Sequence, residues 1–213
     1  MKPLRIHTGI AAPLDRPNVD TDQIIPKQFL KLIGRTGYGK FLFYDWRYKT
    51  EDQPDTAFVL NDPRYNGRAS VLIAGRNFGC GSSREHAVWA LYDYGFRVVL
   101  ALSFADIFSS NAVKNGLATV VLTEEEIAEL TRRARDIQDY QLTIDLENKQ
   151  VKDALGFKAA ITMDEFRRQC LLEGLDDIKR TLQQEASIAA FEGKRRPRGS
   201  PKTGHVRSPQ NRP

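Results

Sequence analysis

Between residues 70 and 122, short apolar segments alternate with segments that carry helix-start signals, and this alternation limits the fold more than any other feature of the sequence. The apolar segments are residues 70–74, 96–102 and 117–122, which are rich in valine, isoleucine and leucine. Such short segments are typical of buried strands. Strands that alternate with helices usually pair in parallel. The sequence therefore predicts an α/β domain with a largely parallel central sheet flanked by helices.

Hydroxyl side chains followed three residues later by an acidic residue predict where the helices of this region begin. In such a capping box the hydroxyl and the carboxylate each accept a hydrogen bond from a backbone amide of the first turn. Glycines at positions 95 and 116 predict the ends of the first two helices. The pairs are Ser82 with Glu85, Ser103 with Asp106, and Thr123 with Glu126.

The segments that follow residue 123 predict different elements. Residues 141–146, a polar turn and Val151 are typical of a β-hairpin. Residues 164–173 and 176–191 are expected to form C-terminal helices, which are interrupted at Gly174.

The distribution of charge divides the chain into a folded part and a basic tail. The net charge of the whole chain is +5, but residues 193–213 contain seven Lys or Arg, no acidic residue and four of the ten prolines. The 32 basic residues less these seven leave 25 against 27 acidic residues, so residues 1–192 carry a net charge of −2. We therefore predict one domain over residues 1–192, with a β-rich N-terminal part, and a disordered tail over residues 193–213. The tail is either a solvated terminus or an arm that binds polyanions.

Hydropathy and cysteine content argue against several classes of protein. No apolar run approaches the roughly 20 residues that span a bilayer. The N-terminus lacks the apolar segment of a secretory signal, and two cysteines cannot build a disulfide framework. We expect a cytoplasmic protein whose folded part binds neither membrane nor nucleic acid.

Residues 34–40 have the glycine and lysine spacing of a phosphate-binding loop, but the next residue is Phe41 instead of Ser or Thr. Without that hydroxyl the loop lacks its usual Mg²⁺ ligand. We expect a mobile glycine-rich loop here and no nucleotide hydrolysis.

The glycine-rich segment 79–84 follows a predicted strand and precedes a predicted helix. Glycines let backbone amides converge, and a helix N-terminus attracts anions. Arg84 occupies the position where a dinucleotide-binding loop has its third glycine, and its planar fork suits a carboxylate. The segment predicts a site for a small carboxylated or phosphorylated molecule. Ser82 is either a helix cap or a catalytic group, and the residues leave both roles open.

Cys80 and His86 offer another possibility, a thiol nucleophile with an imidazole base. No Asn or Asp is obviously placed to orient the imidazole. Cys80 is more typical of a small buried residue, and Cys170, on the apolar face of a predicted helix, is expected in the core.

Several sequence blocks resemble a known family. Residues 79–87, GCGSSREHA, resemble the signature of the swivelling domain of aconitase-type hydro-lyases. Residues 18–26 and 103–108 match two other blocks expected around that signature. The segments 35–39, 44–47, 166–170 and 174–176 resemble the small subunit of bacterial 3-isopropylmalate dehydratases, and the resemblance runs from near residue 5 to about residue 191.

This resemblance implies a reaction and roles for particular residues. Members interconvert 2- and 3-isopropylmalate in leucine biosynthesis by removing and re-adding water. The resemblance implies that Ser82 is the catalytic base, and that Ser83 and Arg84 bind substrate. It also implies that Arg35 and Thr36 belong to a substrate-selecting loop. Supporting roles fall to Thr21, Asp22, Glu85 and His86.

The resemblance also implies a partner. The family reaction needs a [4Fe–4S] cluster held by three cysteines, and this chain has only two. No metal is therefore expected on this chain, and a large subunit is expected to carry the cluster. Three alternatives stay open: a related hydro-lyase subunit acting on homoaconitate, citraconate or dimethylmalate, a non-catalytic anion-binding or regulatory domain, and a cysteine hydrolase.

Overall fold

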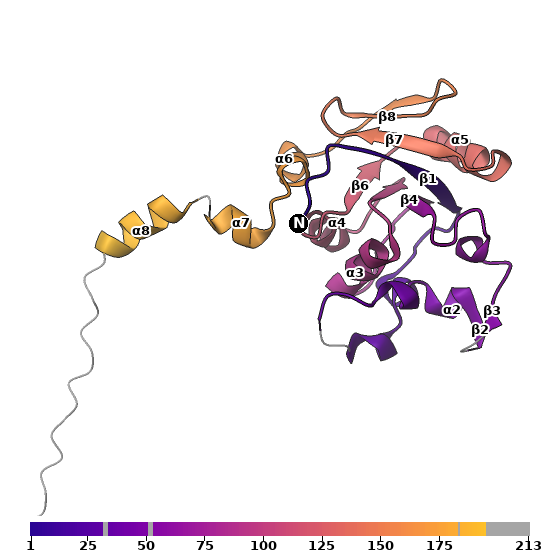
Figure 1. Ribbon diagram of the computed structural model, residues 1–213, viewed down its shortest axis with the longest axis horizontal. Helices are drawn as coiled ribbons and strands as arrows, with labels where there is room; N and C mark the ends of the chain where they lie inside the picture. Colours follow the sequence, from indigo (N-terminus) through magenta and orange to yellow (C-terminus); the bar gives the residue numbers. More distant parts are fainter. Residues whose placement is uncertain (32–33, 51–52, 183, 195–213) are drawn as a thin grey trace, which may run out of the picture. The chain divides into compact units, whose positions relative to one another are not determined.

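The computed structural model describes residues 1–31, 34–50, 53–182 and 184–194. The chain divides into two compact units, Met1–Asp177 and Ile178–Pro213. The described residues of the first unit form a seven-stranded sheet with helices on both faces (Figure 1).

The sheet combines a parallel half with an antiparallel half. Among the described residues, β6, β5, β4 and β1 pair in parallel in that order. β1 also pairs antiparallel with β7, which continues into β8 and β9. The predicted α/β class is confirmed. The strands are β1 (Ile6–Leu14), β4 (Ala69–Ala74), β5 (Val98–Ala101), β6 (Ala118–Val121), β7 (Gln141–Asp145), β8 (Gln150–Lys152) and β9 (Lys158–Ala160).

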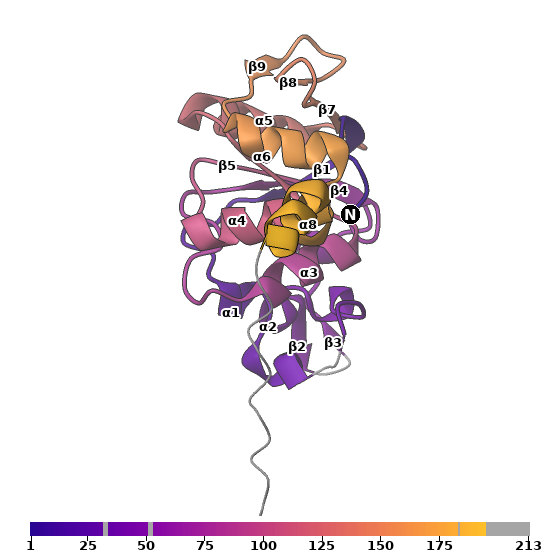
Figure 2. The same cartoon turned by 90° about the vertical axis from the view of Figure 1, so that its left-hand side faces the viewer.

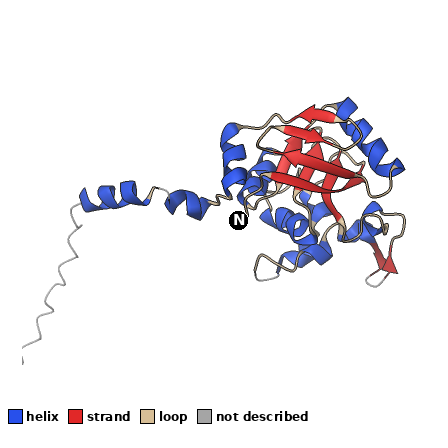
Figure 3. Cartoon of the chain, turned by 45° about the horizontal axis from the view of Figure 1, so that its top comes forward, coloured by secondary structure: helices blue, strands red, loops and turns tan. Residues whose placement is uncertain are grey.

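Both faces of the parallel half are buried, which explains its nearly continuous apolar segments. Leu72 and Ala74 of β4 pack into a core with α3 (Glu85–Tyr94), while Val71 and Ile73 pack into a second core with α5 (Glu124–Asp136). The helix α4 (Asp106–Lys114) contributes Phe108 and Ala112 to the first core, and α6 (Glu165–Glu173) contributes Leu171 to the second. Figure 2 shows these layers, and Figure 3 shows the strands between helices.

The sheet curls so that its two outer edges approach each other. Val121 at the end of β6 forms an isolated antiparallel bridge with Thr162, which follows β9. The hairpin predicted over residues 141–151 is present as β7 and β8, and β9 extends it.

Short helices connect the strands of the N-terminal part, which was predicted to be β-rich. Besides β1, this part contributes the pair β2 (Tyr48–Thr50) and β3 (Gln53–Pro54). The connecting elements are α1 (Thr21–Ile24), α2 (Tyr44–Arg47) and 3-10 turns at Lys27–Lys31, Gly39–Phe41 and Val59–Asn61.

The capping-box prediction is confirmed for α5 and wrong for α3 and α4. In α5 the Thr123 hydroxyl accepts from the Glu126 amide, and the Glu126 carboxylate accepts from the Thr123 amide. α3 begins at Glu85, three residues after Ser82, and its N-cap position is Arg84. α4 has Ala105 at its N-cap position. The Ser103 hydroxyl accepts instead from the Asn77 amide, at 2.8 Å.

The described residues of the C-terminal region form separate helices instead of the single helix predicted over residues 176–191. These are α7 (Asp177–Leu182) and α8 (Glu185–Lys194), and position 183 lies outside the described residues. The predicted division at residue 192 falls within α8, which ends at Lys194. Residues 195–213 lie outside the described residues, so the predicted tail remains a prediction there. Among the described residues, no helix has the length and apolar character needed to cross a membrane.

Candidate active site

Three loops meet where β1, β4 and β5 end. Because these strands are parallel, their carboxyl ends lie at the same edge of the sheet, where α/β proteins commonly bind ligands. Isolated bridges join Asp20 to Cys80 and Phe78 to Phe104. The segments 18–26, 79–87 and 103–108, which are distant in sequence, therefore form one region.

Polar contacts tie these loops together. The Asn77 side-chain amide donates to the Asn18 side-chain oxygen at 3.0 Å, and the Asn77 backbone amide donates to the Ser103 hydroxyl. Gly79 donates its amide to the Val19 carbonyl at 2.7 Å. Gly79 has φ +77°, and a Cβ atom there would lie 2.2 Å from the Phe108 ring. Only glycine fits this close approach without strain.

Thr21 fixes the backbone of Ser82. Its hydroxyl donates to the Ser82 carbonyl and accepts from the Ser82 amide, both at 3.1 Å. The Thr21 amide also donates to the Cys80 carbonyl at 2.9 Å. Thr21 is only 2% exposed. A buried threonine on α1 thus positions the loop that carries the predicted base.

Asp22 of α1 orients Arg84, at the start of α3, through an ion pair. The Arg84 side chain is 17% exposed and the Asp22 side chain is 38% exposed, so water reaches the carboxylate more easily than the guanidinium. Lys27 lies 3.6 Å from the other Asp22 oxygen. Asp20 caps α1 by accepting from the amides of Asp22 and Gln23, which fixes the backbone that carries the Asp22 side chain.

Ser82 and Ser83 lie in an exposed loop before α3. The Ser82 carbonyl accepts from the Arg84 amide at 2.8 Å, which forms a tight turn. The Ser82 hydroxyl makes no hydrogen bond with the described residues. Ser82 is therefore not a helix cap. Of the two roles that the sequence left open, only that of a catalytic group remains.

Glu85 and His86 make contacts within the fold. The Glu85 carboxylate accepts from the Asn115 side-chain amide at 2.7 Å. The His86 ring lies 4.6 Å from the Trp89 ring and 5.3 Å from the Tyr38 ring. Burial lowers the pKa of His86, so its imidazole is neutral at pH 7. Both residues hold the start of α3 in place.

The environment of Cys80 disfavours a thiolate nucleophile. Burial, followed by the negative charge of Asp20, raises the pKa of the Cys80 thiol. The His86 ring is packed against the rings of Tyr38 and Trp89. This counts against the cysteine hydrolase alternative.

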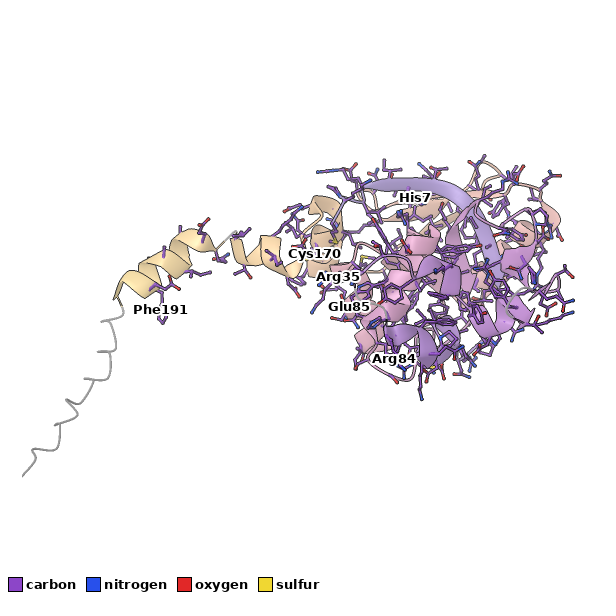
Figure 4. The ribbon with its side chains drawn as sticks, turned by 60° about the horizontal axis from the view of Figure 1, so that its bottom comes forward. His7, Arg35, Arg84, Glu85, Cys170 and Phe191 are labelled. Atoms are coloured by element: carbon purple, nitrogen blue, oxygen red, sulfur yellow. The ribbon has the colours of Figure 1, made fainter. Side chains whose placement is uncertain are left out.

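The loop with Arg35 and Thr36 is attached to α3. The Asp93 carboxylate near the end of α3 accepts from the amides of Gly37 and Gly39, at 2.8 and 2.9 Å. The exposed Arg35 guanidinium lies 5.6 Å from the Trp89 ring centre. In Figure 4, Arg35, Glu85 and Arg84 lie in the same region of the first unit. The expectation that the glycine-rich loop is mobile stays a prediction. Two of its amides, at Gly37 and Gly39, are bonded to Asp93 of α3, so a carboxylate takes amides that a phosphate would need.

Sequence reasoning missed three residues whose contacts hold the site together, namely Asp93, Asn77 and Asn115. Each joins segments far apart in the chain, and no local pattern marks them. The aconitase-type resemblance pointed to Thr21 and Asp22, but it did not specify the contacts that they make.

The cysteines of this chain do not fit the ligand set of an iron–sulfur cluster. Such a cluster needs three or four thiolates that converge. Cys170 is 4% exposed inside the second core, as predicted, and Cys80 lies on the loop after β4. Among the described residues, no group of three His, Cys, Asp or Glu side chains could hold a metal ion.

Comparison with known proteins gives consistent matches. Residues 1–125 match the Aconitase C-terminal domain. The 3-isopropylmalate dehydratase small subunit of Brevibacillus brevis is 57% identical, over 92% of this chain and 100% of the relative. The corresponding protein of Acidobacterium capsulatum is 57% identical over 90% of each chain. The crystal structure of a 3-isopropylmalate dehydratase from Methanocaldococcus jannaschii superposes with a TM-score of 0.62 at 26% identity, and covers 88% of this chain and 99% of that chain.

Proposed function

This chain belongs to the family of 3-isopropylmalate dehydratase small subunits, and from this premise we propose that its candidate site takes part in the interconversion of 2- and 3-isopropylmalate. The enzyme is a hydro-lyase, which removes and re-adds water. One observation carries the assignment of the site. Ser82 has an exposed hydroxyl that caps no helix, on a backbone fixed by Thr21 and two residues from an arginine oriented by Asp22.

Ser82 would act as the base that removes a proton from the carbon next to a substrate carboxylate. A serine hydroxyl is not basic at neutral pH unless its alkoxide is stabilised. Arg84 supplies positive charge close to it in the chain. The first amides of the ten-residue helix α3 add partial positive charge, because the side chain at the N-cap position does not cap them.

Arg84 and Ser83 would bind substrate. As the proton leaves, negative charge develops on the neighbouring carboxylate, and a guanidinium can bind that carboxylate with two parallel hydrogen bonds. The Asp22 carboxylate holds Arg84 in one orientation, so little reorganisation is needed during the reaction. Ser83 lies in the same exposed loop and can donate one further hydrogen bond.

Arg35 and Thr36 would contact the substrate from the opposite loop. Both are exposed, and the attachment of this loop to Asp93 limits how far they can move from α3. Thr21, Asp22, Glu85 and His86 would act as positioning residues through the contacts described above.

A second chain would complete the enzyme. Departure of hydroxide in this family depends on a [4Fe–4S] cluster as Lewis acid, and the two cysteines of this chain do not fit that role. We therefore assign the cluster to a large subunit and expect the assembly to work in the cytoplasm.

The test is the Ser82→Ala variant, reconstituted anaerobically with the large subunit and assayed by single-turnover dehydration of 3-isopropylmalate. The rate should fall by roughly 10²–10⁴, the usual contribution of a positioned acid or base. The melting temperature should hardly change, because no helix cap is lost. Ser110→Ala, which replaces an exposed serine of α4, is the matched control and should keep the wild-type rate.

A Ser82→Ala complex with a near-native rate would remove Ser82 as the base. Turnover of homoaconitate, citraconate or dimethylmalate but not of isopropylmalate would favour the related hydro-lyases. Binding of carboxylates without turnover by any complex would favour the non-catalytic anion-binding domain.

A further inference from the structure

An open hollow lies between α2, β2 and the C-terminal end of α3, and the proposed reaction makes no use of it. Its volume is about 410 Å³. Lys40, Arg47, Tyr48, Asp93 and Tyr94 line it, together with the backbone of the glycines at 37 and 39. Ser82, Ser83 and Arg84 are not among the lining residues.

Arg47 is a buried cation without a counter-charge in the described part of the chain. The residue is 7% exposed. Its Nε donates to the Asn61 side-chain oxygen at 3.2 Å, and the rings of Tyr48 and Tyr94 lie 5.3 and 5.1 Å from its guanidinium carbon. No carboxylate of the described residues forms an ion pair with it. Burying a charge is costly unless it is paired, so this arrangement is suited to an anion from outside the chain.

The other charges of the hollow leave it positive. Lys40 is exposed at the rim and forms no ion pair with the described residues; its ammonium lies 4.9 Å from the Phe41 ring. Asp93 contributes the only formal negative charge among the lining residues, and one of its oxygens already accepts from two backbone amides. The two cations Lys40 and Arg47 and the one carboxylate of Asp93 give the lining of the hollow a net charge of +1.

We propose that this hollow binds a small free oxoanion, a carboxylate or a phosphate. The planar Arg47 guanidinium, which lies near the rings of Tyr48 and Tyr94, would offer paired donors to the anion. The flexible Lys40 side chain at the rim adds its ammonium as a second positive charge beside the anion. The hollow shares the segment 37–40 with the loop that carries Arg35, so the bound anion also stabilises that loop against α3.

The binding test uses inorganic phosphate and acetate as probes, with calorimetric titration of the full chain alone and of the chain reconstituted with the large subunit. Wild type should bind at least one probe saturably in both forms. Lys40→Ala should weaken binding by about tenfold or more, the value of one charge-assisted hydrogen bond. Lys158→Ala, which replaces an exposed lysine of β9, is the matched control and should change the affinity by less than about twofold.

Arg47→Lys keeps the charge and removes the fork, and it should also weaken binding while the melting temperature in the absence of anion stays close to that of wild type. If Arg47→Lys fails to fold, Lys40→Ala decides the question alone. Equal affinities of Lys40→Ala and Lys158→Ala, or no saturable binding, would overturn the proposal. Binding by the isolated chain that disappears in the complex would also overturn it, because a surface of the large subunit would then occupy the hollow. None of these readouts depends on dehydratase turnover.

Discussion

Replacing Thr21 by valine should damage the site from a residue that does not itself react. Valine has nearly the shape of threonine but lacks the hydroxyl that bonds both the amide and the carbonyl of Ser82. Each hydrogen bond contributes about 0.5–1.5 kcal/mol net, so the pair contributes about 1–3 kcal/mol. Because Ser82 is exposed, water can replace part of the lost hydrogen bonding. We therefore expect the free energy of unfolding to fall by about 1–1.5 kcal/mol.

In a unit of this size, that loss lowers the melting temperature by roughly 2–6 °C. The rate effect should be larger in free energy, because a misplacement of about 1 Å at a reacting group can cost 100-fold. We expect kcat to fall by about 10-fold to 100-fold. The measurements are thermal unfolding of the isolated chain and steady-state dehydration by the reconstituted complex.

Thr21→Ser is the matched control, because it keeps the hydroxyl and removes only a methyl group. It should recover most of kcat. Equal loss of kcat in the serine and valine variants would show that the hydroxyl is not the cause. A valine variant with wild-type kcat and melting temperature would refute the positioning role altogether.

Other variants test separate parts of the structure. Gly79→Ala forces a positive φ and a clash with Phe108, so it should cost about 2–4 kcal/mol, measured by denaturant unfolding. Arg84→Lys should keep the fold, seen by circular dichroism, and lose most turnover, because a point charge cannot replace a bidentate fork. Burial alone would raise the pKa of Asp153. Hydrogen bonds outweigh that effect, so the pKa is lowered overall; they come from the side chains of Tyr140 and Arg133 and the amides of Leu155 and Phe157. Its stabilisation is therefore present above about pH 4 and is lost as the pH falls from there through the lowered pKa, so Asp153→Asn should flatten the fall in melting temperature below about pH 4. Deletion of residues 193–213 should leave kcat unchanged if they form the predicted tail.

Local sequence signals predicted those elements whose stabilising contacts are local. The Thr123 and Glu126 pair satisfies both halves of a capping box inside one helical turn, so its position follows from four residues. The strands β4, β5 and β6 are buried on both faces, and their apolar segments show this directly.

Similar signals failed where a contact with a distant segment fixes the serine's hydroxyl or its backbone. The Ser103 hydroxyl bonds the Asn77 amide, and the backbone of Ser82 bonds Thr21, so neither serine begins a helix. These partners come from other strand ends, and their proximity depends on the order of strands in the sheet. The sequence resemblance indicated the site residues, whereas their contacts required the three-dimensional arrangement.

The central position of β1 affects how the protein is made. β1 precedes every other strand in the chain but lies between β4 and β7, with Ile10 opposite Ala69 and Ile6 opposite Asp145. A ribosome adds about 5–20 residues per second, so the partner of Ile6 is synthesised roughly 7–28 s later. During that time one edge of β1 has no strand to pair with, and the loop that must close is long. Newly made chains should therefore be most prone to aggregate before β7 emerges, and most dependent on chaperones at that stage of synthesis.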